Sequence, residues 1–272
     1  MESDLTSFAD IHNHLVPDVD DGARSVEDTI EAVQRMTGSG IRKIVTTPHL
    51  DGSLTRDAAA LDERLCEVSS AFDEAARAVA LDFPEVDFRR GHEVMLDVPD
   101  VDFSDPRLRL AGTRFVLVEW PRLQLPPGTT KVLRRVSEQG YRVLVAHPER
   151  YIGMDVELAG RWKEAGALLQ VNHGSLEGRY GGEALSLAMS LLRRGWVEYL
   201  ATDFHARPDH KLYMDEARAR LNELGAGEAF VMMSLTNPAR VMRDEPPIPV
   251  PALPAERGLW ARMRGFLRPE SV

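Results

Sequence analysis

Short runs of apolar, often β-branched residues alternate along the chain with longer segments whose apolar positions recur at helical spacing. This alternation is typical of repeated βα units around a parallel sheet. Periodicity alone does not distinguish a closed barrel from an open sheet, and we favour a barrel. The predicted strands are seven short segments, at 8–15, 41–47, 86–94, 115–119, 142–146, 167–171 and 197–201.

Helices are predicted between these strands. The first begins at Ser25, which can act as N-cap with an acidic residue three positions later, and it ends near Gly38. Residues 54–80 are rich in Ala, Leu, Glu and Arg and predict a long helix that ends before Pro84. Further helices are predicted at 129–139, 156–164, 183–194 and 208–224, with a short one from Asn237.

The composition changes near residue 243, where a proline-dense stretch begins that cannot supply ladder hydrogen bonds. We expect this stretch to run extended over the surface. Trp260, Met263 and Phe266 follow at helical spacing among arginines, which predicts a short amphipathic helix. Packing on the domain or on a second subunit is favoured for it over a membrane surface. The expected organisation is one large α/β domain at 1–242 and a tail at 243–272.

Charge and cysteine content narrow the function classes. A formal net charge of -10 argues against a nucleic-acid groove and against binding to anionic lipid. The single cysteine, Cys66, excludes an internal disulfide and fits a reducing compartment. The first residues contain no apolar run of signal length, so neither secretion nor membrane insertion is expected. We therefore expect a cytoplasmic protein.

The first predicted strand carries chemistry at its end. Asp10, His12 and His14 alternate in DIHNH, which places all three side chains on one face. Two imidazoles with this spacing can bind one metal ion at the mouth of the sheet.

Other predicted strands end in the same way. Six of the seven strands deliver a histidine or a carboxylate to one rim, which is the strongest feature of this sequence. The further residues at strand ends are His49, Glu93, Glu119, His147, Asp203 and His205.

This many donors suits two or three divalent ions better than one, because a single zinc takes about four ligands. Mixed imidazole and carboxylate donors fit Mn, Fe or Zn, and Cys66 alone cannot form a thiolate site. Such a cluster can generate a metal-bound hydroxide at neutral pH and stabilise an in-line displacement. The sequence therefore predicts a phosphoester hydrolase.

Several residues have a plainer interpretation. His92 faces the opposite side from Glu93, so we expect a packed histidine there. His173 is isolated after the sixth strand, and His210 is expected in solvent at a helix start. Arg150 could form a surface ion pair, but we favour a bidentate contact with phosphate.

The segments DIHNHLVPDVDDGA, TTPH, GHEV, AHPERY, QVNHGSL and ATDFHA together resemble one family. It comprises the bacterial manganese-dependent tyrosine-protein phosphatases of the polymerase-and-histidinol-phosphatase superfamily. The resemblance runs from about Asp10 to about Arg240. It implies a distorted seven-stranded (β/α) barrel, a three-metal centre with Mn²⁺ as the expected ion, and removal of phosphate from tyrosines of a kinase that controls capsule or exopolysaccharide export.

The residues carried over from the family extend the candidate site. Asp21, which from its turn alone could be only a turn residue, becomes a predicted ligand. Arg150 is expected to hold the phosphate, and with Asp21 and His205 it forms the predicted catalytic set. The predicted metal ligands are His12, His14, Asp21, His49, Glu93, Glu119, His147, Asp203 and His205.

The sequence departs from the family in three places. Leu50 replaces a second histidine after TPH, and His173 replaces an alanine. The family's second arginine is shifted, which leaves Arg207 as a predicted substrate contact.

Three functions compete. We favour a tyrosine phosphatase acting on a phosphotyrosine protein, with a bacterial tyrosine kinase as the expected partner and self-association as a further expectation. A small-molecule phosphatase, for instance one acting on histidinol phosphate, would use nearly the same ligands. A non-catalytic kinase-binding protein would leave the ligand set without a purpose. DNA exonuclease activity is disfavoured by the acidic charge.

Overall fold

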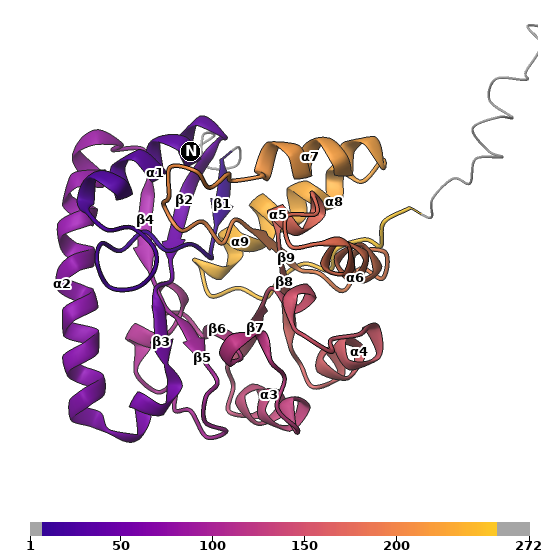
Figure 1. Ribbon diagram of the computed structural model, residues 1–272, viewed down its shortest axis with the longest axis horizontal. Coiled ribbons are helices and arrows are strands. Elements are labelled where there is room, and N and C mark those ends of the chain that lie inside the picture. The colour runs from indigo at the N-terminus through magenta and orange to yellow at the C-terminus, as the bar shows by residue number, and fades with distance from the viewer. Residues whose placement is uncertain (1–6, 255–272) are drawn as a thin grey trace, which may run out of the picture.

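The computed structural model describes residues 7–254, which fold as parallel strands surrounded by helices (Figure 1). A three-stranded sheet has the order β1 (Phe8–Asp10), β2 (Ile41–Thr46) and β4 (Asp87–Arg90). A six-stranded sheet has the order β3 (His49–Asp51), β5 (Glu93–Met95), β6 (Phe115–Glu119), β7 (Arg142–Ala146), β8 (Leu168–Asn172) and β9 (Tyr199–Ala201). All the ladders are parallel, so the predicted α/β class is confirmed.

The two sheets share two stretches of chain. β2 continues into β3 after a break at Pro48, which lacks a backbone N–H, and β4 continues into β5 after a break at Gly91. The prediction of one unbroken strand at 86–94 is therefore wrong. The strand is interrupted where Gly91 packs closely against Leu110. A Cβ added to Gly91 would lie 2.8 Å from the Leu110 Cα.

Backbone hydrogen bonds also join the ends of the first and last strands. Asp203 N donates to His12 O and His14 N donates to Phe204 O, each at 2.9 Å. The buried carboxylate of Asp10 accepts from Thr202 N at 3.0 Å and from Thr202 Oγ1 at 2.5 Å. We call this contact the β1–β9 seam. Beyond one isolated bridge at the seam, no regular ladder among residues 7–254 joins the sheets into a closed barrel.

The strands are apolar on both faces. An inner cluster contains Ile11, Val45, Leu117, Leu144 and Tyr199, all fully buried. A larger outer cluster lies between the strands and the helices and includes Trp120 and Trp162, whose ring centroids are 4.9 Å apart. Burial on both faces is the pattern expected of parallel strands covered by helices.

The helices agree with most of the predicted positions. Ser25 caps α1 by accepting from Asp28 N, as predicted. The predicted start at 208 is wrong, because Tyr213 has a left-handed backbone (φ 58°) and α7 begins only after it. The longer helices are α1 (Val26–Gly38), α2 (Ala58–Asp82), α3 (Thr129–Glu138), α4 (Val156–Glu164), α6 (Gly182–Leu192) and α7 (Met214–Glu223), and the short ones are α5 (His173–Leu176), α8 (Gly227–Val231) and α9 (Asn237–Val241).

The described part of the proline-rich stretch lies on the domain without regular structure. Val250 and Leu253 are buried, and Leu253 N donates at 3.2 Å to the backbone oxygen of Leu192, the last residue of α6. The predicted amphipathic helix with Trp260, Met263 and Phe266 lies outside the described residues. Within residues 7–254, no helix is both long and apolar enough to cross a membrane.

Candidate metal centre

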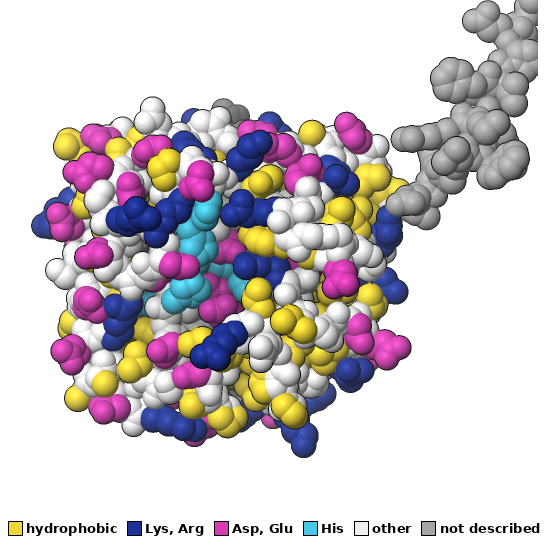
Figure 2. Space-filling view, in the orientation of Figure 1, with side chains coloured by type: hydrophobic (Ala, Val, Ile, Leu, Met, Phe, Trp, Pro, Cys, Tyr) yellow, Lys and Arg dark blue, Asp and Glu magenta, His cyan; other side chains and the backbone are white. Residues whose placement is uncertain are grey.

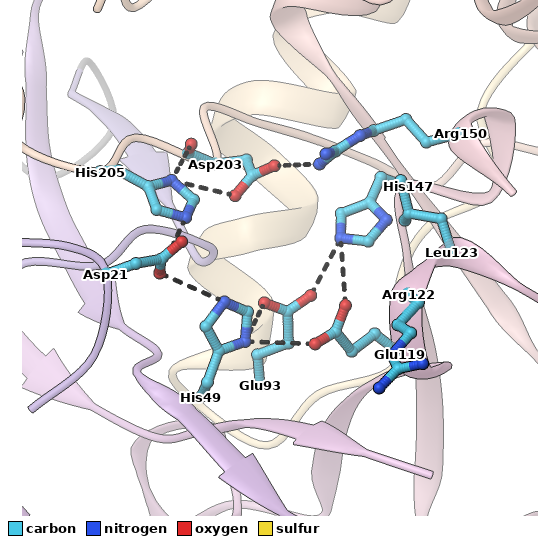
Figure 3. Close-up of a pocket in the computed structure, with 10 residues that line it drawn as sticks. All are labelled: Asp21, His49, Glu93, Glu119, Arg122, Leu123, His147, Arg150, Asp203 and His205. Carbon is cyan, nitrogen blue, oxygen red and sulfur yellow. Dashed lines mark hydrogen bonds and ion pairs between the residues drawn. The ribbon is translucent and has the colours of Figure 1, made fainter. Parts of the chain in front are cut away.

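Seven of the nine predicted ligands line one cavity of about 230 Å³ at the carboxyl ends of the strands (Figure 3), and the fully buried His12 and His14 lie against Glu93 in its wall. Figure 2 shows histidine and acidic side chains exposed together in this hollow, with basic side chains around it. The strands run parallel, so their carboxyl ends share one rim and side chains that follow them meet there. The cavity is lined by Asp21, His49, Glu93, Glu119, Arg122, Leu123, His147, Arg150, Asp203 and His205.

Glu93 is the centre of the cluster. Its Oε2 lies 3.1 Å from His12 Nε2, 3.4 Å from His14 Nε2 and 3.3 Å from His49 Nδ1. Its other oxygen, Oε1, lies 3.0 Å from His147 Nε2. Four imidazoles thus surround one buried carboxylate, which is a position suited to bridging cations.

Two further carboxylates extend the cluster on either side. Glu119 Oε1 lies 3.2 Å from His49 Nδ1. Asp203 Oδ1 lies 3.5 Å from His12 Nε2 and 3.6 Å from His205 Nδ1, while its Oδ2 accepts from Arg150 Nη1 at 2.6 Å. Both extensions face the same cavity as Glu93.

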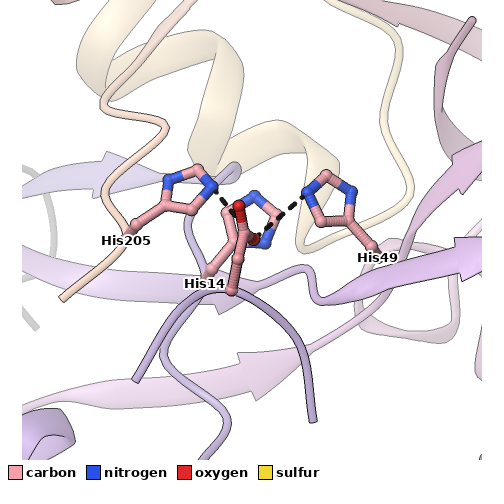
Figure 4. A group of neighbouring side chains, drawn as sticks. His14, His49 and His205 are labelled. Carbon is pink, nitrogen blue, oxygen red and sulfur yellow. Dashed lines mark ion pairs between the residues drawn. The ribbon is translucent and has the colours of Figure 1, made fainter. Parts of the chain in front are cut away.

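Asp21 connects the histidines at the mouth of the cavity. Its Oδ1 lies 3.5 Å from His49 Nε2 and 3.4 Å from His205 Nε2. The ring of His14 lies between theirs, with centroids 4.4 Å from His49 and 4.1 Å from His205 (Figure 4). The three rings therefore present their nitrogens to one small volume.

Several buried polar atoms in the cluster have no hydrogen-bond partner. They include Nε2 of His12, Nε2 of His14 and Oε2 of Glu93, which all face one another. An unpartnered buried polar atom costs about 1–3 kcal/mol, and a metal ion placed among these atoms would satisfy them. Nitrogen and oxygen donors in this mixture fit Mn, Fe or Zn. The residues therefore fit a divalent metal centre.

The charges in the cluster support the same conclusion. Burial by itself would raise the pKa of Glu93, but His12, His14 and His147 hold that pKa well below its usual range. Burial would lower the pKa of His12, but Glu93 and Asp203 raise it to about 9. Glu93 is thus kept in its charged form, which a cation needs, and because a metal ion binds only the neutral imidazole, metal affinity should fall as the pH falls.

A second layer of amides orients these groups. Gln170 Nε2 donates to Asn172 Oδ1 at 2.8 Å, so Gln170 Oε1 is an acceptor. His12 Nδ1 lies 2.7 Å from that oxygen and must carry a proton, which leaves Nε2 free toward Glu93. Asn172 Nδ2 in turn donates to Asp203 Oδ2 at 2.7 Å. One pair of amides therefore sets the orientation of two predicted ligands.

Substitution of Gln170 with leucine is expected to lower metal affinity by about 10- to 100-fold, because His12 would lose its orienting acceptor. Isothermal titration with Mn²⁺ measures this change. Gln170→Glu keeps an acceptor for His12 and should retain more of the affinity, whereas the exposed Gln34→Leu serves as control. Equal affinities for all four proteins would contradict a positioning role.

The predicted ligands can be compared with the geometry directly. All nine lie in four groups whose ligand atoms are within 4.8 Å of one another. His92 instead binds Arg107 O at 2.9 Å, and His173 Nε2 lies 3.4 Å from Ser234 Oγ. Burial lowers the pKa of His92 to about 4 and that of His173 to about 3. Neither histidine belongs to these groups.

The two predicted substrate arginines differ in position. Arg150 lines the cavity, where it pairs with Asp203 and lies 4.3 Å from the Tyr180 ring centroid. Arg207 does not line it and donates to Asp21 O at 2.7 Å.

Sequence reasoning missed several residues. Asp20 accepts from His14 Nδ1 at 2.7 Å and from His49 N at 3.1 Å, although its neighbour Asp21 was the one singled out. The Asp-Asp-Gly turn in the sequence could have indicated Asp20 as well as Asp21. The QVN segment could similarly have indicated Gln170 and Asn172. Arg122 lines the cavity from a left-handed backbone position (φ 53°), and no local pattern pointed to it.

A sequence profile for capsular polysaccharide synthesis proteins of the CpsB/CapC type matches residues 8–243. The chain belongs to the CpsB/CapC family. All nine predicted ligands of this CpsB/CapC chain lie within the matched range.

Curated relatives match over nearly the whole CpsB/CapC chain. Tyrosine-protein phosphatase YwqE of Bacillus subtilis is 26% identical, covering 91% of this chain and 96% of the relative. Tyrosine-protein phosphatase CpsB of Streptococcus pneumoniae is 24% identical, covering 87% and 98%. A chain from the crystal structures of these two proteins, which are called unique metal-dependent tyrosine phosphatases, superposes with a TM-score of 0.75 at 26% identity. That superposition covers 92% of this chain and 100% of the other.

Proposed function

We propose that this protein is a metal-dependent protein-tyrosine phosphatase that acts on a phosphotyrosine protein of capsule or exopolysaccharide synthesis. The observation that carries the proposal is the cluster of nine nitrogen and oxygen donors, with Arg150 on the wall of the same cavity. The named relatives support it, since they are tyrosine phosphatases with similar length and fold.

We propose manganese as the resident metal, with two or three ions held by the nine predicted ligands and Fe or Zn as alternatives. The unpartnered Nε2 atoms of His12 and His14 support a divalent ion at this position, and manganese itself is taken from the family resemblance. When bound, such ions act as Lewis acids, lower the pKa of water and template an in-line displacement.

The chain's own groups have separate proposed roles. Arg150 is held by Asp203 and Tyr180 and presents its guanidinium to a phosphate in the cavity. His205 Nδ1 lies 2.9 Å from Asp203 O, so its Nε2 faces Asp21. We assign Asp21 and His205 to the catalytic set as ligands that would hold metal at the mouth of the cavity, because their facing atoms are the ones available to a cation there. We keep Arg207 as a second substrate contact, because it binds the Asp21 backbone at the cavity edge.

We also propose the finer fold class, a distorted (β/α)7 barrel of the polymerase-and-histidinol-phosphatase type. The β1–β9 seam and the apolar inner cluster support it. The proposed domain boundary, 1–242 followed by a tail at 243–272, is supported by the family match at 8–243.

For the biological setting, we propose a bacterial tyrosine kinase as the phosphotyrosine partner and self-association as a further property. We place the protein in the cytoplasm, where ATP-dependent kinases form phosphotyrosine.

The test is phosphate release from a phosphotyrosine peptide with and without Mn²⁺, alongside histidinol phosphate at equal concentration. We expect manganese-dependent release from the peptide, and its loss in His12→Ala because His12 Nε2 faces Glu93 and Asp203. Preference for histidinol phosphate would instead support the small-molecule phosphatase. Absence of turnover on both substrates in metal-loaded protein would support a non-catalytic partner.

A further inference from the structure

A second cavity, of about 380 Å³, lies beside the metal centre and shares two wall residues with it, Leu123 and Arg150. Figure 3 shows these two side chains on the same side of the first cavity. Its size falls within the range of small-ligand pockets. Any group bound to Arg150 in the first cavity therefore has this second space directly next to it.

The second cavity is mostly apolar and is built from three loops and α6. We call it the flanking groove, and its larger apolar and aromatic side chains are Leu123, Tyr151, Ile152, Met154, Tyr180 and Leu187. Ile152 is 70% exposed, which is unusual for a large aliphatic side chain. Figure 2 shows hydrophobic side chains gathered next to the histidine-containing hollow. Exposed apolar surface beside a reactive site marks a place where a partner side chain can be buried.

The walls of the flanking groove are held in place. Ile152 N donates to Leu123 O at 2.9 Å, which joins the loop after β7 to the loop after β6. The buried Tyr151 hydroxyl accepts from Trp120 N at 3.1 Å. A groove fixed by such contacts can bind a side chain without first ordering its own loops.

Charge decides which side chain fits. Besides the shared Arg150, the charged residues in the lining are Glu149 and Glu183. The Arg150 guanidinium pairs with Asp203, which lines the first cavity, and we assign it to the phosphate bound there. Glu149 is buried and accepts from Asn172 N and Ser175 Oγ, so the exposed carboxylate in the lining is that of Glu183. An acidic side chain would be repelled by Glu183, whereas an apolar side chain would cover Ile152 and Leu123.

We propose that the flanking groove binds an apolar side chain that lies within two residues of the phosphotyrosine in the substrate chain. This inference rests on the proposed function. An extended chain advances about 3.4 Å per residue, so neighbours of a tyrosine whose phosphate contacts Arg150 reach the adjacent cavity.

The test uses phosphotyrosine peptides that carry a single Leu, Gly or Asp at each of the two positions on either side. At one position, Leu should raise kcat/KM about tenfold over Gly, because burying a leucine is worth about 1.5 kcal/mol or more. At the same position, Asp should give a lower kcat/KM than Gly. The Leu-to-Gly ratio should approach one in Ile152→Asp and stay at its original value in Leu81→Asp, a control at an aliphatic residue that is 82% exposed on α2.

A second experiment measures the affinity of the same peptides by fluorescence anisotropy, with a non-hydrolysable phosphonate in place of the phosphate. It tests binding in the groove independently of catalysis. A Leu preference in binding with no phosphate release in manganese would contradict the proposed function and support the groove. If the original protein releases phosphate but shows no preference for Leu at any position, the groove proposal is wrong and the proposed function stands. The same conclusion follows if the preference for Leu is unchanged in Ile152→Asp. A change of oligomeric state in Ile152→Asp with an unchanged peptide preference would assign the surface to self-association and overturn the proposal.

Discussion

Replacing Glu93 with glutamine is expected to abolish metal binding and to lower kcat/KM by roughly 10³-fold or more, since loss of an outer-shell partner alone typically costs 10- to 100-fold. Glu93 is fully buried, and its two oxygens lie within 3.4 Å of four imidazole nitrogens. Glutamine has the same shape but no charge, and its amide nitrogen cannot accept or bind a cation. Metal content by plasma mass spectrometry and phosphate release measure the two effects.

The matched control is Glu198→Gln, a change at another largely buried carboxylate. Glu198 accepts from Leu169 N at 2.9 Å and pairs with Lys163, away from the metal cluster. This variant should lose stability but keep its metal. A Glu93→Gln protein that retains full metal content and activity would refute the central position of Glu93.

Replacing Arg150 with alanine is expected to lower kcat by about 10²- to 10³-fold, which is the usual effect of removing one donor to a developing negative charge. The Arg150 Nη1 donates to Asp203 at 2.6 Å, and the Arg150 side chain is only 22% exposed. Bulk water therefore cannot easily replace the hydrogen bonds that Arg150 would donate to a phosphate. Arg150→Lys keeps the charge but loses the planar fork, and should recover only part of the rate. Steady-state kinetics on a phosphotyrosine peptide test both variants.

Because Arg150 also neutralises Asp203, metal content has to be measured in the same samples. Arg220→Ala is the control, since Arg220 pairs with Glu177 on the surface. A kcat within threefold of the original for Arg150→Ala with metal retained would rule out transition-state stabilisation by this residue.

The sequence predicted best where local signals and tertiary structure agree. β6 and β7 occupy the predicted ranges, and so does α4, because an apolar run or an N-cap marks each boundary. Eight of the nine predicted ligands also followed from strand ends, whereas Asp21 followed only from the family resemblance. The break at Gly91 and the late start of α7 were missed, since they depend on a contact with Leu110 and on the backbone of Tyr213.

The orienting groups and the flanking groove could not be predicted for a related reason. Gln170 meets His12 across 158 residues, and nothing in the local sequence encodes that contact. Leu123 and Ile152 meet through backbone atoms of two loops, which carry no side-chain signal.

The β1–β9 seam has a consequence for the order of events on the ribosome. Asp10 and Thr202 are separated by 192 positions. During synthesis, the Asp10 carboxylate therefore has to wait for Thr202 before these hydrogen bonds can form. At 5–20 residues per second, this wait is roughly 10 to 40 s. During that time the nascent chain carries His12 and His14 without Asp203 or His205. A metal ion that binds both the first and the last of these predicted donors can therefore find its complete ligand set only after His205 has been synthesised.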